Sequence, residues 1–237
     1  MTEKIVQLPN SFWPSDPMLP EPEPVSRAQA GLPSDAFVFC CFNANHKIRP
    51  AMFDLWARLL RSVPDSVLWI RDCYPALNAR FRHEAKLRGI DERRIVFAGR
   101  MDSFARHLGR QAQADLFLDT YPYTAHATAS DALWAGLPVV TLRGQSFVSR
   151  VSAGLLANVG LQELVASSAE EYETLALSLA RDRGRLSDVR QRLAKARKTA
   201  PLFDMDGFVR GIEAAYLEMH ARAQRGERPA AFKASSA

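Results

Sequence analysis

The sequence predicts an α/β fold built on a doubly wound, parallel, six-stranded sheet of the Rossmann-like kind. From Ala36 onward, short apolar runs of buried-strand length alternate with longer segments whose apolar residues recur every three or four positions. Small and polar residues separate each run from the helix that follows it. Repeated strand–helix–strand units of this kind predict parallel strands joined by right-handed crossovers, in the usual 3-2-1-4-5-6 order.

The apolar runs place the strands and the periodic segments place the helices. The expected strands are Phe37–Phe42, Val67–Ile70, Ile95–Ala98, Leu116–Leu118, Val139–Leu142 and a weak one near Leu164–Val165. The expected helices between them are Pro50–Arg61, Asn78–Leu87, Ser103–Gln113, Thr128–Ala135 and a segment from about Phe147 to Ala157. Three more helices, Ala169–Ala180, Leu186–Lys198 and Asp204–Ala223, should close the domain.

Composition sets the domain organisation. Seven of the fourteen prolines fall within the first 34 residues, which predicts that residues 1–35 form a proline-rich extended arm or linker. Residues 36–223 form one domain, and we expect residues 224–237 to be a disordered tail. No apolar run approaches the roughly 18 residues of a membrane span, and no signal-peptide core follows Met1. We therefore expect a cytoplasmic protein with no membrane partner, whose three cysteines are reduced thiols.

A net charge of +5 and eight basic residues between Arg181 and Lys198 raise the possibility of a basic interaction module that binds nucleic acid. Leu186, Val189 and Leu193 recur at helical spacing in that run, so its basic side is better read as a solvated helix face. We expect no nucleic-acid partner. A mildly basic protein also suits a small anionic ligand such as a nucleoside diphosphate.

The stretch after the fourth strand carries the main functional signal. It delivers His126 and Thr128 to the start of a helix, where free backbone N–H groups and the helix dipole favour a phosphate. Asp131 lies one turn further along the same face, within reach of a sugar hydroxyl. The alternative is that Thr128 is only a helix cap and His126 only a loop histidine.

Topology brings a second loop to the same place. Strands one and four are neighbours in the expected order, and their following loops open a crevice at the carboxyl end of the sheet. The loop after strand one contains Asn43 and Lys47. We therefore expect Lys47 and the helix start near Thr128 to face one diphosphate. Asp115 and Asp119 straddle a buried strand, which is poor spacing for a divalent cation, so we expect no metal site.

A dense motif gives these residues a family context. The run Leu118-Asp119-Thr120-Tyr121-Pro122-Tyr123-Thr124-Ala125-His126-Ala127-Thr128-Ala129-Ser130-Asp131-Ala132-Leu133-Trp134-Ala135-Gly136-Leu137-Pro138 resembles the donor-binding half of the O-linked N-acetylglucosamine transferases, including the SPINDLY-like proteins. Family-like segments at Phe39–Asn43, Ser66–Trp69, Ser149–Val151 and Ala200–Phe203 extend the resemblance over residues 35–220.

The resemblance implies the C-terminal half of a metal-independent, inverting glycosyltransferase of the GT-B type, which needs no cofactor beyond its sugar-nucleotide donor. It implies that Lys47 stabilises the departing diphosphate, as the catalytic group of this half. It also assigns substrate contacts to Asn43, His126, Ala127, Thr128 and Asp131, and contacts near the uracil base to His107 and Arg110. Without this family context, a surface helix charge would be the preferred interpretation of Arg110.

Three departures from the family pattern concern this site. Ala44 stands where the family often has a polar amide, Ala127 replaces the first of two threonines, and Phe104 occupies a position that is lysine in the animal enzymes. Backbone N–H groups survive such changes, so we expect weakened rather than abolished donor binding.

The resemblance therefore predicts the donor-binding domain of an enzyme that transfers N-acetylglucosamine from its uridine-diphosphate sugar (UDP-GlcNAc) to protein Ser or Thr hydroxyls. The expected partners are UDP-GlcNAc, a protein acceptor and a separate acceptor-binding half or a tetratricopeptide-repeat protein. The alternative is a non-catalytic UDP-sugar-binding module or a remnant. An apolar patch around Phe208, Ile212 and Tyr216 is a candidate docking face for the acceptor half.

Overall fold

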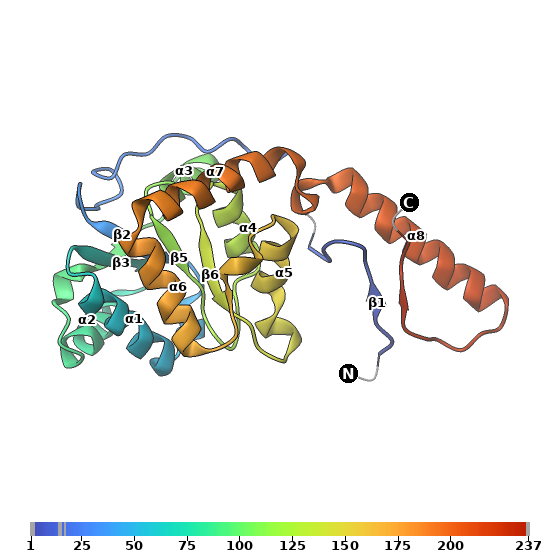
Figure 1. Ribbon diagram of the computed structural model, residues 1–237, viewed down its shortest axis with the longest axis horizontal. Coiled ribbons are helices and arrows are strands. Elements are labelled where there is room, and N and C mark those ends of the chain that lie inside the picture. The colour runs from blue at the N-terminus through green and yellow to red at the C-terminus, as the bar shows by residue number, and fades with distance from the viewer. Residues whose placement is uncertain (1–2, 14–15, 17, 236–237) are drawn as a thin grey trace.

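A parallel six-stranded sheet forms the centre of the protein (Figure 1). The computed structural model describes residues 3–13, 16 and 18–235, so small parts of the predicted arm and tail, residues 1–2, 14–15, 17 and 236–237, lie outside it. The strands follow the order β4-β3-β2-β5-β6-β7, which confirms the predicted 3-2-1-4-5-6 arrangement. They are β2 (Phe37–Cys41), β3 (Ser66–Arg71), β4 (Ile95–Ala98), β5 (Leu116–Leu118), β6 (Val139–Leu142) and β7 (Val165–Ala166).

The central strands read as continuous apolar runs because helices cover both of their faces. Every residue of β2, β5 and β6 is buried. In register, Cys40 of β2 lies between Trp69 of β3 and Phe117 of β5, and all three side chains are fully buried. Large side chains on adjacent strands therefore fill the core that fixes the carboxyl edge of the sheet.

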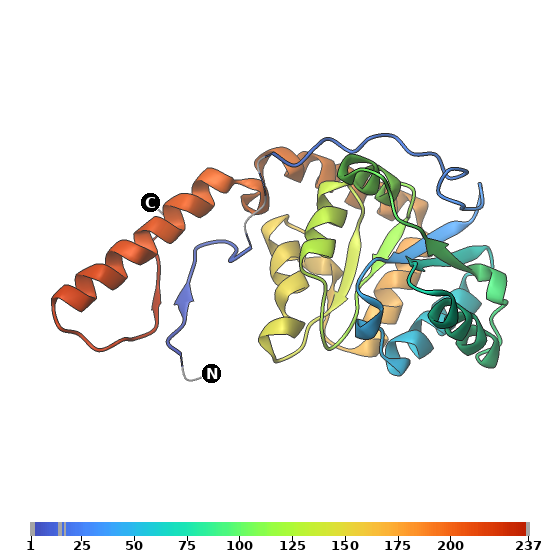
Figure 2. The same ribbon diagram turned by 180° about the vertical axis from the view of Figure 1, so that it is seen from behind.

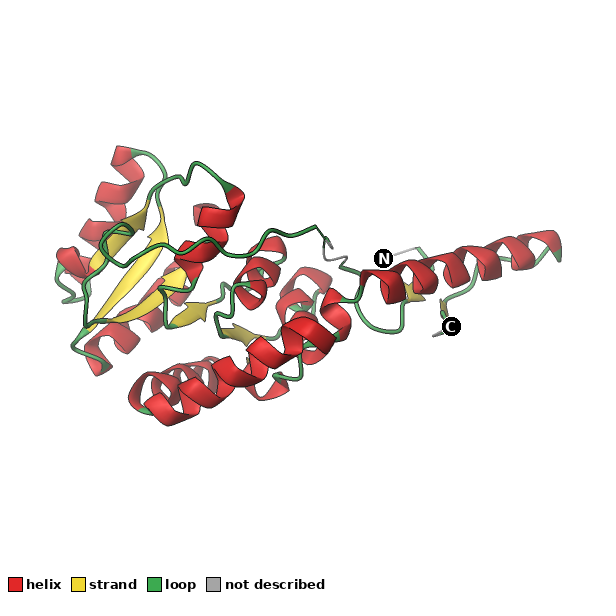
Figure 3. Ribbon diagram, turned by 90° about the horizontal axis from the view of Figure 1, so that it is seen from above, coloured by secondary structure: helices red, strands yellow, loops and turns green. Residues whose placement is uncertain are grey.

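Helices form a layer on each side of the sheet, as the view from above makes plain (Figure 3). Helices α1 and α6 pack on one face, with α2 against the β4 edge, whereas α3, α4 and α5 lie together on the other (Figure 2). Their bounds are α1 (Pro50–Ser62), α2 (Pro75–Leu87), α3 (Phe104–Gln111), α4 (Ala127–Trp134), α5 (Val151–Asn158), α6 (Ala169–Arg181), α7 (Arg183–Thr199) and α8 (Met205–Gln224). Among the described residues, no helix combines the length and apolar character that a bilayer span requires.

The observed start of a helix differs from the sequence prediction by three or more residues at three places. Helix α2 begins at Pro75 rather than Asn78, because proline is well suited to the first helical turn. The segment expected to be one helix from Phe147 divides into a 3₁₀ turn at Phe147–Ser149 and the helix α5. Helix α7 starts earlier than predicted, where the Asp182 carboxylate accepts a hydrogen bond from the backbone N–H of Arg185.

The N-terminal arm packs along the body as an extended segment. Val25 and Leu32 are buried in the main core, and the backbone N–H of Glu23 donates to the carbonyl oxygen of Ala105 at 3.0 Å. Figure 2 shows the arm passing across the α3 and α4 side of the sheet. A glycine at position 109 makes this path possible, because a Cβ there would lie 1.6 Å from the carbonyl oxygen of Glu23.

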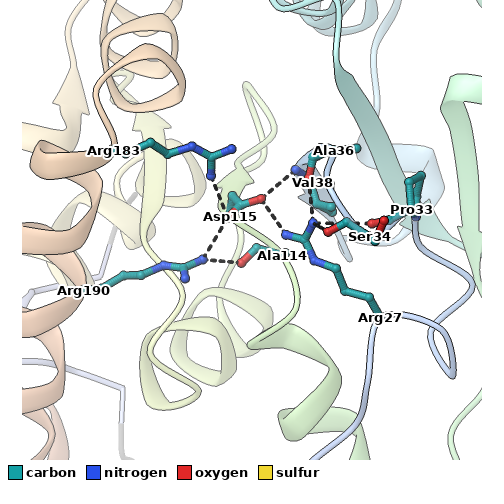
Figure 4. A network of polar contacts seen from close by, with 9 residues as sticks. All are labelled: Arg27, Pro33, Ser34, Ala36, Val38, Ala114, Asp115, Arg183 and Arg190. Carbon is teal, nitrogen blue, oxygen red and sulfur yellow. Dashed lines mark hydrogen bonds and ion pairs between the residues drawn. The ribbon is translucent and has the colours of Figure 1, made fainter.

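A polar cluster binds the arm at the amino-terminal end of the strands, opposite the end that carries the crevice. One Asp115 oxygen accepts from Arg27 Nη2 at 3.0 Å and from the backbone N–H of Val38 at 2.8 Å. The other pairs with Arg190 at 3.4 Å and Arg183 at 3.6 Å (Figure 4). One buried carboxylate thus joins the arm, the sheet and α7.

Helix α8 projects from the body, and the two short strands β1 (Val6–Gln7) and β8 (Phe232–Lys233) lie beside it (Figure 1). The two strands pair in parallel, which sequence reasoning does not predict in a segment expected to be a disordered tail. On the expected docking face of α8, Phe208 and Ile212 are half-buried and Tyr216 is exposed.

Candidate functional site

Two loops meet at the carboxyl end of the sheet, where β2 and β5 lie side by side. Asn43, just after β2, is buried, and its Nδ2 donates to Asp119 Oδ1 at 3.0 Å and to Thr120 Oγ1 at 2.7 Å. Its Oδ1 accepts a hydrogen bond from the hydroxyl of Thr128 in the first turn of α4. Asn43 therefore ties the β2 loop to the β5 loop and to the start of α4.

Asp119 shapes the loop that follows β5. Its Oδ1 accepts from the backbone N–H groups of Thr120 and Ala125, each at 2.7 Å, and its Oδ2 accepts from the hydroxyl of Thr141 at 2.7 Å. Burial raises the pKa of Asp119, and these hydrogen bonds oppose that shift by favouring the carboxylate. The side chain is fully buried, so it folds the loop and does not face a ligand.

Lys47 reaches across from the β2 loop, where Asn45–Lys47 form a 3₁₀ turn. Its Nζ donates to the carbonyl oxygen of Thr124 at 3.1 Å and lies 3.8 Å from the centre of the Tyr123 ring. Burial lowers the pKa of Lys47 below its usual 10.5, while the nearby Asp119 opposes that shift. The ammonium group thus lies beside the loop that leads into α4, as topology predicts.

The start of α4 offers unused hydrogen-bond donors. His126 precedes the helix, and among the described residues no side chain caps it and no acceptor pairs with the backbone N–H groups of Ala127 and Thr128. Burial, and then the charge of Lys47, lower the pKa of His126, so the imidazole is neutral at pH 7. Its Nε2 is buried and has no partner in the part of the chain that the structure describes.

Asp131 follows one turn further along α4. Its carboxyl group is largely shielded, and burial raises its pKa to about 6. Unlike Asp119, it has no hydrogen-bond donor among the described residues. A carboxyl group held this way is suited to a hydroxyl donor brought by a ligand.

A cleft of about 680 Å³ opens next to Thr128. Its walls come from the ends of β3 and β4 and from α3. The lining residues are Phe42, Arg71, Asp72, Cys73, Ala98, Gly99, Arg100, Met101, Asp102, Ser103, Phe104, His107, Arg110 and Thr128. The cleft holds more positive than negative side chains, which favours an anionic or electron-rich ligand.

Arg110 and His107 form the α3 wall of this cleft. Arg110 is only 5% exposed, which rules out the surface-charge interpretation. Its guanidinium donates to the carbonyl oxygen of Gly99 and lies 5.0 Å from the Phe42 ring centre. Burial and the positive charge of Arg110 lower the pKa of His107 to about 4, so its imidazole stays neutral at physiological pH. Phe104 stacks on that imidazole with ring centres 5.9 Å apart.

The structure places the eight predicted site residues around one continuous region. Asn43, Lys47, His126, Ala127, Thr128 and Asp131 lie at the crevice between the two loops, and His107 and Arg110 line the adjoining cleft. Sequence reasoning missed Arg71 and Tyr123. Arg71 ends β3, next to β2 in the sheet, so the rule that ligands bind at strand carboxyl ends could have identified it.

Metal binding has no support in the described residues, which contain no group of three or more His, Cys, Asp or Glu side chains positioned to hold an ion. The expectation of a site without a metal or cofactor stays a prediction. The crevice offers instead a lysine and backbone N–H groups, and these can bind an anion directly.

Comparisons with known proteins give the site its context. The profile of glycosyl transferase family 41 matches residues 19–212. The chain is 34% identical over 240 residues to the probable UDP-N-acetylglucosamine–peptide N-acetylglucosaminyltransferase SEC of Arabidopsis thaliana, covering 98% of this chain and 24% of that protein. It is 37% identical over 201 residues to a UDP-N-acetylglucosamine–peptide N-acetylglucosaminyltransferase of Caenorhabditis elegans, covering 85% of this chain and 17% of that protein.

Solved structures agree with this assignment. A mutant O-GlcNAc transferase of Thermobaculum terrenum superposes with a TM-score of 0.77 at 33% identity, covering 87% of this chain and 38% of that one. The sucrose-phosphate synthase of Thermosynechococcus elongatus, at 17% identity and a TM-score of 0.59, shares the fold alone. The chain spans only a fraction of each relative and corresponds to the C-terminal domain of a GT-B glycosyltransferase. It belongs to glycosyl transferase family 41.

Proposed function

We propose that this chain is the donor-binding domain of an inverting glycosyltransferase that moves N-acetylglucosamine from UDP-GlcNAc to Ser or Thr hydroxyls of proteins. The named activity of the relatives supports the choice of donor and acceptor. The observation that carries the proposal is the meeting of Lys47 with the open N-terminus of α4 across the crevice. We further propose that the protein works without a metal, in the cytoplasm.

The proposed mechanism follows from where charge develops. As the glycosidic bond breaks, the departing uridine diphosphate (UDP) gains negative charge, so donors already fixed around it stabilise the transition state. Lys47 supplies a positive charge, and the N–H groups of Ala127 and Thr128 supply dipoles aimed at the same place. The imidazole of His126, at the start of the same helix, adds a further donor or acceptor, according to its tautomer.

The rest of the donor fits the neighbouring walls. The ribose hydroxyls would meet Asp131, whose carboxyl group has no protein donor among the described residues. The base would enter the cleft lined by His107 and Arg110, where planar side chains favour stacking. This arrangement places the diphosphate between the base cleft and the crevice, with Thr128 bordering both.

A second candidate function is a UDP-sugar-binding module without transferase activity. Transfer also requires an acceptor hydroxyl that is held and deprotonated, and positioning the two reactants supplies much of the rate. The described residues build one Rossmann-like domain, and the crevice groups assigned above all act on the donor side. We therefore propose that a partner half supplies the groups that hold and deprotonate the acceptor hydroxyl, and that this half docks near Tyr216 on α8.

A basic nucleic-acid module is a weaker candidate, because most arginines of α7 are engaged within the protein. Arg190 pairs with Asp115, Arg192 with Glu163, and Arg197 donates to Glu21 at 2.9 Å. Engaged arginines present less free charge to a phosphate backbone.

The test is a titration followed by a transfer assay. Calorimetry with UDP, uridine and duplex DNA should show binding of UDP, weaker binding of uridine and no binding of DNA. Incubation of the 237-residue chain with labelled UDP-GlcNAc and an acceptor peptide should give no transfer. Transfer should appear when the upstream part of a family 41 enzyme is supplied. A chain that does not bind UDP would disprove the donor-site assignment, and transfer by the chain alone would disprove the need for a partner half.

A further inference from the structure

The N-terminal arm touches the diphosphate end of the proposed donor site. The indole of Trp13 contacts the imidazole of His126 edge-on, with ring centres 6.1 Å apart and planes at 68°. The preceding ring, Phe12, packs on Phe147 with centres 5.0 Å apart. Phe147 belongs to the loop after β6, whose Val148 carbonyl oxygen accepts a hydrogen bond from the N–H of Thr124. The arm thus lies against both loops that frame the start of α4.

Trp13 is held in this position from several sides. Its backbone N–H donates to the hydroxyl of Ser11 at 2.9 Å, and the carbonyl oxygen of Asn10 accepts from the side chain of Asn158 in α5 at 3.4 Å. The indole also borders a small cavity together with Leu202 and with Phe208 of α8. The half-buried ring therefore bridges the base of α8 and the imidazole of His126.

The same arm continues to the other donor-binding helix. The backbone N–H of Glu23 pairs with the carbonyl oxygen of Ala105 in α3, the helix that carries His107 and Arg110. Beyond it, Arg27 is fixed by Asp115 (Figure 4). The arm accordingly spans the two helices that carry the base cleft and the diphosphate site.

The contact matters because two aromatic rings pack on the His126 imidazole. The Tyr123 ring also packs on this imidazole, with ring centres 5.3 Å apart, and the His126 Nε2 has no partner among the described residues. Tyr123 in turn lies under the ammonium group of Lys47. Edge and face contacts between rings favour particular orientations, so Trp13 and Tyr123 together limit how the imidazole can turn.

From this geometry we infer that Trp13 is a positioning residue of the diphosphate site. It limits the orientations that the His126 imidazole can take beside the open N-terminus of α4, and the arm around it is an integral wall of the donor site rather than a linker. The inference rests on the proposed UDP-binding function and adds to it a residue outside the β2 and β5 loops.

The experiment compares UDP and uridine binding in single variants of the full chain. Trp13→Leu keeps an apolar side chain against Leu202 but lacks the ring, whereas Trp13→Phe keeps an aromatic edge. We expect Trp13→Leu to weaken UDP binding about three- to tenfold, the range typical of an aromatic pair, and to leave uridine binding unchanged. Trp13→Phe should restore most of the loss. Met18→Ala is the matched control, because Met18 lies on the same arm and is 82% exposed.

Each outcome separates this inference from the proposed function. If the wild-type chain does not bind UDP, the proposed function fails and the inference falls with it. If the wild-type chain binds UDP and Trp13→Leu binds it equally well, only the positioning role is wrong. Equal weakening of UDP and uridine, or no recovery in Trp13→Phe, would also reject that role. Thermal melting of each variant shows that the binding data come from folded protein.

Discussion

Replacing Lys47 with alanine tests the central contact of the proposed site. The Lys47 ammonium already lies 3.1 Å from the Thr124 carbonyl oxygen, so it needs no large movement to meet a phosphate. A charge-assisted hydrogen bond contributes about 1.5–3 kcal/mol, which corresponds to a roughly 10- to 150-fold loss of UDP affinity. Uridine has no phosphate, so its affinity should stay within about twofold of the wild-type value on the same reasoning.

The pH dependence of UDP binding gives a second, independent readout of the same residue. Burial lowers the pKa of Lys47 below 10.5, and a lysine is charged only below its pKa. Raising the pH should therefore reduce the wild-type advantage over Lys47→Ala, and this reduction should begin at a lower pH than an ordinary lysine would give. Bound diphosphate stabilises the charged form, so the two affinities should become equal only above the higher pKa that Lys47 has in the complex.

Isothermal calorimetry with both ligands measures these affinities, and Lys86→Ala serves as control because Lys86 is an exposed lysine near the end of α2. Lys47 also contacts Thr124 and the Tyr123 ring in the free protein, so thermal unfolding must be followed in parallel. Equal losses of UDP and uridine affinity would refute the assignment of Lys47 to the diphosphate. A pH-independent ratio between wild type and variant would refute the role of its charge.

Three further changes test other parts of the site. Ala127→Thr, at an exposed position in the first turn of α4, should tighten UDP binding modestly by adding a hydroxyl donor, and unchanged or weaker calorimetric binding would mean that this side chain points away from the ligand. Folding lowers the pKa of His107 from 6.5 to about 4, so its contribution to stability is present above pH 6.5 and is lost as the pH falls through about 4. Chemical denaturation of His107→Asn should therefore show a smaller decrease in unfolding free energy over that pH range than the wild type. Parallel curves of unfolding free energy against pH would contradict this. Gly109→Ala places a Cβ 1.6 Å from the Glu23 carbonyl oxygen and should destabilise the fold by about 1–3 kcal/mol. Gly154→Ala is the control, because the space around Gly154 is open and this change should not destabilise the fold. Equal melting temperatures for the two variants would contradict the path of the arm.

The sheet and the crevice could be predicted because their signals are local and repeated. Buried parallel strands such as Phe37–Cys41 read as unbroken apolar runs, and the crossover rule converts their order in sequence into their order in space. The same rule predicts from the sequence alone that Lys47 and Thr128 lie together at the carboxyl end of the sheet. Predicted strand bounds therefore differ from the observed ones by only a residue, as at Ser66–Arg71.

The arm contacts could not be predicted, because they depend on single long-range approaches that leave no periodic pattern. Glu23 lies against the backbone at Gly109, and Trp13 contacts His126, although the residues of each pair are far apart in the sequence. Proline-rich composition indicates an extended chain but not what that chain touches. The protonation state of His126 could not be predicted either, because its pKa depends on burial and on the charge of Lys47, which lies close only in the folded structure.

Asp119 has a consequence for the thermodynamics of ligand binding. Its two oxygens accept hydrogen bonds from Asn43, Thr120, Ala125 and Thr141, so a single carboxylate fixes the loops after β2 and β5 to the neighbouring strand β6 before any ligand arrives. Folding has therefore already met the entropy cost of ordering those loops. Association with a diphosphate should accordingly show a favourable enthalpy and a heat-capacity change no larger than the contact area requires, because no segment of the crevice has to fold around its ligand.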